Sequence, residues 1–265
     1  MNISILGTGN LGLAIAKGLL AIDRVAQLTL TKRKPETLHD FSTDARVQIT
    51  SNNLEAASKA DVLIIAVQPY HIEGVLQEIK EVLAPDVVLI SVATGVQLAY
   101  IEAIIGADKN IIRAMPNTAI VVQQSMTCLC ANATGKAQVT IAKTIFDTLG
   151  ASLEIPEQHM QAATVICASG IAFWMRLIRA TTQGAIQLGF DADEAQQLAM
   201  QTSLGAAQLI IKSGNHPEQE IDKVTTPQGC TIEGLNEMEH QGLSSSLIKG
   251  IIASYHKINS IKKLN

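Results

Sequence analysis

The chain has 265 residues, of which 47% are hydrophobic and only 3% aromatic, and its formal net charge is −4. This length allows one large or two modest domains, and the composition supplies enough apolar side chains for a sizeable, mainly aliphatic core. Its longest basic run is Lys32–Lys34, in a slightly acidic chain. We therefore expect no nucleic-acid partner.

The apolar start of the chain lacks the positively charged leading region of a secretory signal, and Lys17 interrupts it. No uncharged, uniformly apolar segment reaches the ~20 residues that a membrane-spanning helix needs. The cysteines form no paired Cys-x-x-Cys clusters, so we expect reduced thiols and no metal site. They are Cys128, Cys130, Cys167 and Cys230. These features predict a cytoplasmic protein that does not contact a membrane.

Short apolar runs alternate with helical stretches in the first half of the chain. The runs near 62–67 and 87–93 are apolar almost throughout, which is typical of strands buried on both faces of a parallel sheet. The expected strands are 2–6, 27–31, 61–67, 87–93, 111–115, 126–131 and 152–155. The expected helices are 10–21, 69–83, 96–105 and 136–149, with a further short helix after Asn53. This alternation predicts a doubly wound α/β domain.

After Pro156 the β-branched runs give way to stretches rich in Ala, Gln and Leu with helical spacing. They are 157–188, 192–213, 231–241 and 243–262, separated by Gly189, Gly214 and Gly242. We expect an N-terminal Rossmann-like dinucleotide-binding domain, residues 1–156, and an all-α C-terminal dimerisation and substrate domain, residues 157–265. The apolar helix faces exceed what one small helical layer can bury, which predicts a homodimer or a larger homo-oligomer built from dimers.

The first expected strand leads into a G-x-G-x-x-G motif that opens a helix, the context that a dinucleotide site requires. The first glycine permits a tight turn, the second lets the backbone approach a pyrophosphate, and the third allows close packing of helix on strand. The helix N-terminus adds N–H donors and the positive end of its dipole. The expected cofactor contacts here are Gly7, Thr8, Gly9, Asn10, Leu11 and Gly12.

The end of the second expected strand distinguishes NADP from NAD. An NAD site usually has Asp or Glu there, bonded to the ribose hydroxyls. Here Thr31 is followed by Lys32 and Arg33, and a hydroxyl with two cations suits the 2′-phosphate of NADP. The alternative is an ordinary solvated basic turn. We expect NADPH to be the preferred cofactor and NADH a weaker one.

The segment Asp222–Leu235 carries the most specific pattern in the chain. It is a turn-rich loop that leads into a helix, and its hydroxyls and N–H groups could hold a carboxylate. Its sequence, DKVTTPQGCTIEGL, resembles the D-x-V-T-S-P-G-G-T-T-I-x-G-L signature of pyrroline-5-carboxylate reductases. Arg113–Thr118 is similar to that family's R-x-M-P-N-T, and Gln201–Ala206 to its Q-T-x-x-G-A. The resemblance covers about residues 2–262.

This resemblance implies further cofactor contacts from an Asn just before a short helix, from an A-V-K-P-like turn beside the nicotinamide, and from an S-x-A-A-G-like loop. They correspond to Asn53, Ala66, Val67, Gln68, Pro69, Ala93, Thr94 and Gly95. Asn117 follows a strand at the edge where open α/β sheets bind ligands, so it could orient a carboxamide. Its equally favoured alternative is an Asx-turn that bonds its own backbone.

The resemblance also implies the reaction: NADPH-dependent reduction of L-1-pyrroline-5-carboxylate to L-proline, the last step of proline biosynthesis. Thr231 is the candidate for a hydrogen bond to the ring nitrogen, with a helix N-cap as its alternative role. Thr226 and the N–H groups of Gly229 and Cys230 are expected to hold the substrate carboxylate. Ser169 lies in a stretch that resembles the family's T-A-L-S-G-S-G-P-A-Y and is a further expected substrate contact.

Four positions on the substrate side depart from the family pattern: Cys167, Ile171, Phe173 and Gln228. They leave two alternatives open, a related NADPH-dependent imine or ketone reductase with a changed substrate and a non-catalytic NADPH-binding paralogue. Gln228 stands where the family has glycine, the residue that reaches positive φ freely, so we expect a changed backbone angle there.

Overall fold

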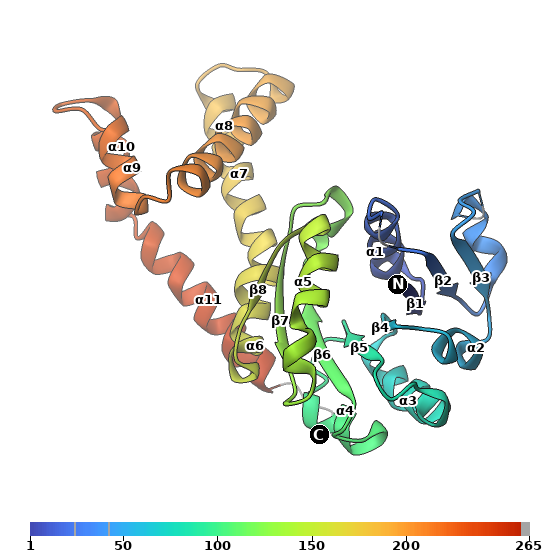
Figure 1. Cartoon of the computed structure of the whole chain (residues 1–265). Coiled ribbons are helices and arrows are strands. Elements are labelled where there is room, and N and C mark those ends of the chain that lie inside the picture. Colours follow the sequence, from blue (N-terminus) through green and yellow to red (C-terminus); the bar gives the residue numbers. More distant parts are fainter. Residues whose placement is uncertain (24, 42, 261–265) are drawn as a thin grey trace. The chain divides into compact units, whose positions relative to one another are not determined.

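The computed structural model describes residues 1–23, 25–41 and 43–260 (Figure 1). They form two compact units. The first comprises Met1–Ala168 with residues 258–260, and the second comprises Ser169–Lys257. The predicted functional division between residues 156 and 157 lies inside the first unit, just before the helix that leads into the second. That functional boundary stays a prediction.

Within the described residues, an eight-stranded sheet of order β3-β2-β1-β4-β5-β6-β7-β8 forms the centre of the first unit (Figure 1). The strands are β1 Asn2–Leu6, β2 Gln27–Thr31, β3 Val47–Thr50, β4 Val62–Ile65, β5 Val88–Ser91, β6 Asn110–Met115, β7 Ser125–Ala131 and β8 Gly150–Glu154. Strands β1 to β6 are parallel, β7 is antiparallel to β6, and β8 is parallel to β7. The order reverses between β1 and β4, and ligands of doubly wound sheets bind at this switch point.

Helices cover both faces of the sheet and create two apolar layers. Helices α1 (Asn10–Leu20) and α5 (Val139–Phe146) pack in one layer. Helices α2 (Asn53–Ser58), α3 (Ile72–Ile79) and α4 (Leu98–Ile105) pack in the other (Figure 1). The strand β4 supplies both layers, since Val62 and Ile64 lie in the first, and Leu63 and Ile65 in the second. Its side chains are therefore apolar without interruption.

The second unit is helical throughout its regular structure. The chain enters it through α6 (Met160–Ala163) and a π-helix, Thr164–Ser169. It continues through α7 Gly170–Gln187, α8 Ala192–Ser213, α9 Pro217–Val224, α10 Cys230–His240 and α11 Leu243–Ser260. The expected fold class, a Rossmann-like domain with a helical C-terminal region, is confirmed.

The helical unit buries almost nothing by itself. Within its described part, the buried residues are limited to Gly170, Thr182, Ala195 and Ala199. Large apolar side chains are exposed instead, including Trp174 (65%), Leu188 (82%) and Ile211 (72%). An apolar surface of this extent is typical of a unit that is completed by a partner.

One helical stretch, Glu157–Gln187, is long and apolar enough to cross a membrane by length and composition alone. It contains two exposed arginines, Arg176 and Arg179. A single such helix is weak evidence for a membrane span, because an apolar helix of a soluble protein passes the same test.

One strand and one α-helix of the described residues were not expected from the sequence. The edge strand β3 has only four residues and is partly exposed at every position, although its sequence VQIT alternates apolar and polar residues. Helix α9 shows that residues 222–224 are helical, and our interpretation of the whole segment 222–229 as a loop was wrong. Its start is held by a capping box, in which His216 Nδ1 accepts the N–H of Glu218 and Gln219 Oε1 accepts the N–H of His216.

Candidate functional site

The loop after β1 contains three glycines, and each position has its own reason for lacking a side chain. Gly7 has φ +92°, and a Cβ there would lie 2.7 Å from Val67 Cγ1. A Cβ on Gly12 would lie 2.6 Å from the carbonyl oxygen of Gly7. A Cβ on Gly9, in contrast, would meet no atom within 4 Å. Packing therefore explains Gly7 and Gly12, whereas the open space at Gly9 fits the approach of a bound pyrophosphate.

Gly9 is also the N-cap of α1, and no side chain caps this helix end. The first turn contains no acidic residue, and Asn10 is exposed. The first N–H groups of a helix have no partner within the helix, and they carry the positive end of its dipole. This helix end can therefore donate hydrogen bonds to a phosphate group.

Hydrogen bonds fix the glycine loop to the end of β2. The buried Thr8 donates from both its N–H (3.0 Å) and its hydroxyl (2.5 Å) to the carbonyl oxygen of Thr31. The N–H of Gly7 donates to Thr31 Oγ1 over 3.4 Å, and that hydroxyl donates to Asn53 Oδ1 over 2.8 Å. The Thr31 side chain is thus a buried positioning group. Its predicted contact with a 2′-phosphate stays a prediction.

This chain of hydrogen bonds continues to a residue that sequence reasoning missed. Asn53 Nδ2 donates to Glu78 Oε2 of α3 over 3.0 Å, so the carboxamide of Asn53 is held at both ends. Asn53 is the first residue of α2, and our placement of it just before the helix was wrong by one residue. No sequence signal pairs two residues that lie 25 positions apart on different elements.

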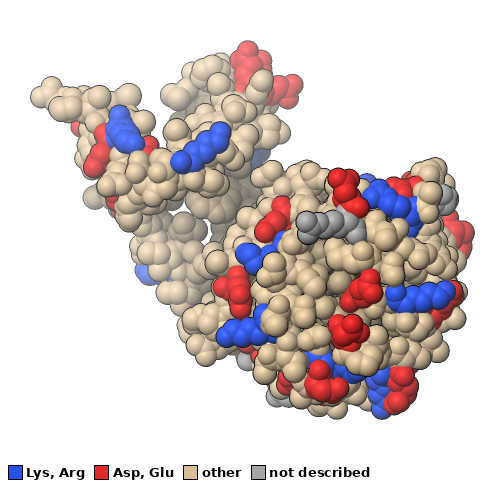
Figure 2. Space-filling model, viewed as in Figure 1, with Lys and Arg blue, Asp and Glu red and all other residues tan. Residues whose placement is uncertain are grey.

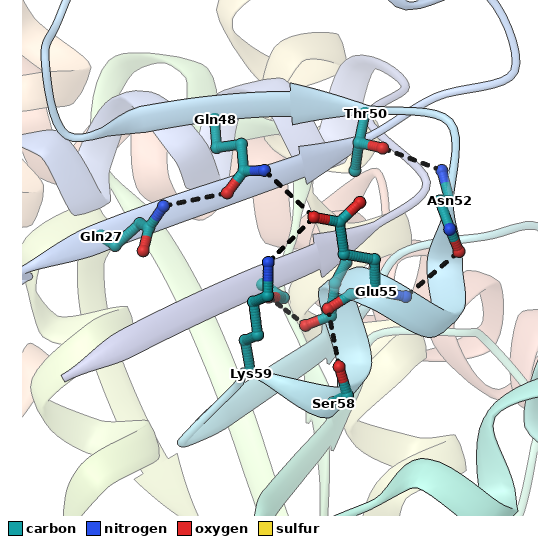
Figure 3. Close-up of polar contacts among 9 residues, drawn as sticks. Gln27, Gln48, Thr50, Asn52, Glu55, Ser58 and Lys59 are labelled. Atoms are coloured by element: carbon teal, nitrogen blue, oxygen red, sulfur yellow. Dashed lines mark hydrogen bonds and ion pairs between the residues drawn. The ribbon is translucent and has the colours of Figure 1, made fainter.

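A polar network fixes the start of α2 and hence the position of Asn53 (Figure 3). Asn52 is the N-cap, and its Oδ1 accepts the N–H of Glu55 over 3.1 Å. The N–H of Asn52 donates to Thr50 Oγ1 over 3.1 Å. Lys59 Nζ donates to Glu55 Oε1 over 2.9 Å, and this bond lowers the pKa of the Glu55 carboxyl.

The predicted phosphate-binding cations follow β2 directly. The N–H of Lys32 donates to the carbonyl oxygen of Thr50 over 3.2 Å. Lys32 is half-buried and Arg33 is exposed. No acidic oxygen of the described residues lies within 4.0 Å of either cationic group. On the visible face of the α/β unit, acidic and basic side chains are interspersed (Figure 2). Both cations are available to a phosphate.

The parallel sheet brings three predicted segments to one edge. The glycine loop follows β1, Ala66–Pro69 follows β4, and Ala93–Gly95 follows β5, and these three strands are neighbours. The N–H of Ala66 donates to the carbonyl oxygen of Leu6 over 2.8 Å, which extends the β1–β4 ladder to the switch point. Gln68 is exposed there and does not cap the short 3₁₀ turn that follows it. The contacts of Thr94 and Gly95 with a cofactor stay predictions.

Asn117 follows β6 at the same edge, but its side chain is bonded within the protein. Asn117 Oδ1 accepts the N–H of Ala119 over 2.9 Å, and Nδ2 donates to the carbonyl oxygen of Cys167 over 3.1 Å. Its own N–H donates to Ser125 Oγ over 3.1 Å. The Asx-turn alternative is confirmed, whereas a contact with the cofactor stays a prediction.

Arg113, the first residue of the RAMPNT segment, is a structural residue. Its buried guanidinium bonds Glu157 Oε1, which also accepts the N–H of Leu98 over 2.8 Å. This ion pair joins β6, α4 and the start of the helical region. Removing Glu157 would leave the buried Arg113 guanidinium without its partner carboxylate, which is strongly destabilising. Sequence reasoning missed Glu157 because 44 residues separate it from Arg113.

The predicted substrate loop lies between α9 and α10 in the helical unit. In this loop, the N–H of Gly229 donates to the carbonyl oxygen of Thr226 over 3.0 Å. A Cβ on Gly229 would collide with the Thr226 hydroxyl. This hydroxyl therefore lies close to the first turn of α10. Gln228 has φ +56°, so a residue other than glycine adopts the left-handed conformation here. The expectation that this angle differs from that of the family stays a prediction.

Helix α10 begins at Cys230, and its N-cap is Gly229 without a side-chain cap. The alternative role of Thr231 as N-cap was therefore wrong. Thr231 is half-buried in the first turn, and Thr226 and Cys230 are exposed. No hydrogen bond of the Thr226 or Thr231 hydroxyl falls among the contacts of the described residues. Both hydroxyls and the N-terminal N–H groups of α10 are thus available to an anionic ligand.

The remaining expectations concern Ser169 and the cysteines. Ser169 ends the π-helix and is half-buried, and its role at a substrate stays a prediction. All four cysteines are free thiols. Among the described residues, no group of three His, Cys, Asp or Glu side chains is placed to hold a metal ion.

Comparisons with known proteins match the N-terminal and the C-terminal region of the chain to known families. Residues 157–261 match the model of pyrroline-5-carboxylate reductase dimerisation, and residues 2–95 match that of NADP oxidoreductase, coenzyme F420-dependent. Pyrroline-5-carboxylate reductase 2 of Dictyostelium discoideum is 41% identical over 285 residues, which cover 100% of this chain and 95% of that protein. The chain belongs to the pyrroline-5-carboxylate reductase family.

Other relatives of this family agree. Pyrroline-5-carboxylate reductase 1 of Dictyostelium discoideum is 42% identical over 98% of this chain, which spans only 49% of that longer protein. The structure of a pyrroline-5-carboxylate reductase from Coxiella burnetii has a TM-score of 0.94, with 31% identity, 99% coverage of this chain and 98% of that one. The match to the family's dimerisation model explains the exposed apolar side chains of the helical unit and supports homo-oligomerisation.

Proposed function

We propose that this chain reduces L-1-pyrroline-5-carboxylate to L-proline with NADPH. The observation that carries the proposal is the 41% identity to a pyrroline-5-carboxylate reductase over the full length of this chain. A solved pyrroline carboxylate reductase from Plasmodium falciparum, 25% identical with a TM-score of 0.82, has NADP bound. It covers 97% of this chain, and this chain covers 96% of it.

The cofactor would lie along the edge formed by the carboxyl ends of β1, β4 and β5. The open space at Gly9 and the uncapped start of α1 fit a pyrophosphate, and the unpaired Lys32 and Arg33 fit a 2′-phosphate. The hydrogen-bonded chain from Gly7 through Thr31 to Asn53 holds this surface in shape before the cofactor binds. When bound, NADPH supplies a hydride; the protein supplies binding, orientation and electrostatics.

The loop 226–231 is the proposed carboxylate site. The Thr226 hydroxyl and the N–H groups at the start of α10 can donate to a carboxylate, and no acidic residue except Glu233 lies in the first turn of that helix. The Thr231 hydroxyl in the same turn would bond the ring nitrogen. A protonated cyclic imine is already an electrophile, so orientation and exclusion of water account for most of the protein's contribution.

We further propose a division of labour, with residues 1–156 holding the cofactor and residues 157–265 providing dimerisation and substrate binding in a cytoplasmic homodimer. The exposed apolar side chains of α7 and α8 support this assembly. Light scattering at micromolar concentration should give a mass of at least two chains, and a monomeric mass would contradict it.

A steady-state assay of NADPH oxidation tests the reaction. Pyrroline-5-carboxylate should support turnover that exceeds turnover with other cyclic imines. A related imine or ketone reductase would instead turn over the other substrates and leave pyrroline-5-carboxylate untouched. A non-catalytic paralogue would bind NADPH, seen as a change in its fluorescence, but would oxidise it with none of the substrates.

A further inference from the structure

Two thiols from distant parts of the chain meet in the second apolar layer of the α/β unit. Cys128 lies on β7 and is 3% exposed, whereas Cys167 lies in the π-helix Thr164–Ser169 and is half-buried. Their sulfur atoms are 3.9 Å apart. The family stretch that this segment resembles has serine in place of Cys167, so the proposed reduction does not need this thiol pair.

We propose that Cys128 and Cys167 are a site of oxidative modification, at which a hydroperoxide converts the two thiols into an intramolecular disulfide. The pair is specific within this chain. Cys130 is buried on the same strand, two residues from Cys128, but it has no sulfur contact among the described residues. Cys230 is exposed on α10 in the other unit.

The surroundings of the two sulfurs allow the bond to form. A disulfide requires the sulfurs to close from 3.9 Å to about 2.05 Å. Strand β7 pairs with β6 and β8, where Cys128 lies opposite Met115 and Leu153, so the Cys128 backbone is fixed on both sides. Cys167 lies in a π-helix, a helix form that is rare and adopted in short segments. We therefore expect most of the adjustment on the Cys167 side.

The environment also distinguishes the roles of the two thiols. The contact between the two thiols lowers the pKa of the half-buried Cys167, and the same contact together with burial raises the pKa of Cys128. The thiolate is the reactive form, and it is favoured at a low-pKa, accessible thiol. Cys167 is thus the attacking thiol, and Cys128 resolves the intermediate.

The chemistry balances in two steps. The Cys167 thiolate attacks one oxygen of hydrogen peroxide, the O–O bond breaks, and protonation of the leaving hydroxide gives water and a sulfenic acid on Cys167. The Cys128 sulfur then attacks the Cys167 sulfur and loses its proton, the S–O bond breaks, and a second water leaves. Two thiols and one peroxide give one disulfide and two waters, and a dithiol reverses the change by exchange.

The disulfide would restrain the segment that leads from the α/β unit into the helical unit. The carbonyl oxygen of Cys167 accepts a hydrogen bond from Asn117, and Ser169 is two residues further along the chain. Closure of the sulfurs would disturb both residues, so we expect lower turnover after oxidation. This last expectation rests on the proposed reductase function, whereas formation of the disulfide does not.

The test is peroxide treatment of the full-length protein, followed by non-reducing digestion and mass spectrometry. The expected result is one cross-linked peptide pair joining Cys128 to Cys167, two hydrogens lighter than the sum of the reduced peptides and lost after dithiothreitol. Cys128→Ser and Cys167→Ser should both lack the pair, and the control Cys130→Ser should retain it. Cys167 oxidised to sulfinic acid without a cross-link, or a link that uses Cys130, would overturn the proposal.

Activity is measured in parallel on the same samples. Peroxide should lower the turnover of the parent protein, and reduction of the disulfide should restore it. Cys128→Ser cannot form the disulfide, so any activity that it loses should not return through reduction of that bond. A cross-link without a change in turnover would leave the modification site intact and remove only its effect on the enzyme. Absence of turnover before treatment would contradict the proposed function and leave the cross-link result to decide the present proposal.

Discussion

Gly9→Ala separates cofactor binding from folding more cleanly than any other change in the glycine loop. Gly9 has φ −82° and ψ −163°, an extended conformation that alanine adopts without strain. Its new Cβ would meet no atom within 4 Å. The loss of an N-cap glycine and the lower entropy of the unfolded chain act in opposite directions, so the free energy of unfolding should change by less than about 1 kcal/mol.

The effect on NADPH should be larger. A methyl group in the open space at Gly9 would hold a pyrophosphate away from the N–H groups of α1. Losing one hydrogen bond to a charged group costs roughly 1.5–3 kcal/mol, which raises Kd by about ten- to a hundredfold. Fluorescence titration with NADPH measures Kd, and urea unfolding without cofactor measures stability.

Gly12→Ala is the matched control. Its Cβ would lie 2.6 Å from the backbone oxygen of Gly7, so α1 must move away from the loop. Overpacking of this kind costs about 1–3 kcal/mol in stability. Gly12→Ala should therefore weaken folding as well as binding. If Gly9→Ala binds NADPH within about twofold of the parent, which is less than 0.5 kcal/mol, then no pyrophosphate lies at Gly9 and the reasoning fails.

Three further predictions address the cations, the loop and the proposed catalytic hydroxyl. Replacing Lys32 and Arg33 with Ala should raise the KM for NADPH about tenfold or more and leave that for NADH nearly unchanged, and equal effects on both would contradict their role. Gln228→Val should lower the free energy of unfolding in urea by about 1–3 kcal/mol, because a β-branched residue must then adopt φ near +56°. Gln228→Gly should not lower it, and equal stability of the two variants would show that the backbone angle relaxes. Thr231→Ala should lower kcat by about ten- to a hundredfold with an unchanged Kd for NADPH, and parent-like turnover would exclude the hydrogen bond to the ring nitrogen.

Local patterns predicted the parts of this protein that depend on local rules. The uninterrupted apolar run at Val62–Ile65 predicted a strand between two helical layers, because each face of the sheet takes alternate residues. The glycine motif predicted a tight turn before a helix, and the structure has Gly7 at φ +92° there. Both features follow from backbone geometry, which neighbouring residues determine.

Partners from distant segments could not be predicted in this way. Glu78 and Glu157 look like ordinary surface carboxylates in the sequence, yet they hold Asn53 and Arg113. The Thr31 hydroxyl, for which a phosphate contact stays a prediction, donates to Asn53, a bond that the sequence did not predict. These contacts depend on the order of the strands and the packing of helices, which no short motif encodes.

Transfer of deuterium is the most direct test of the proposed reaction. The protein is incubated with pyrroline-5-carboxylate and with NADPH that carries deuterium at both positions of nicotinamide C4, and the product is analysed by mass spectrometry. The proposal predicts proline that contains one deuterium, formed in step with cofactor oxidation. Oxidation of NADPH without labelled proline, or no oxidation at all by a protein that binds NADPH, would contradict it.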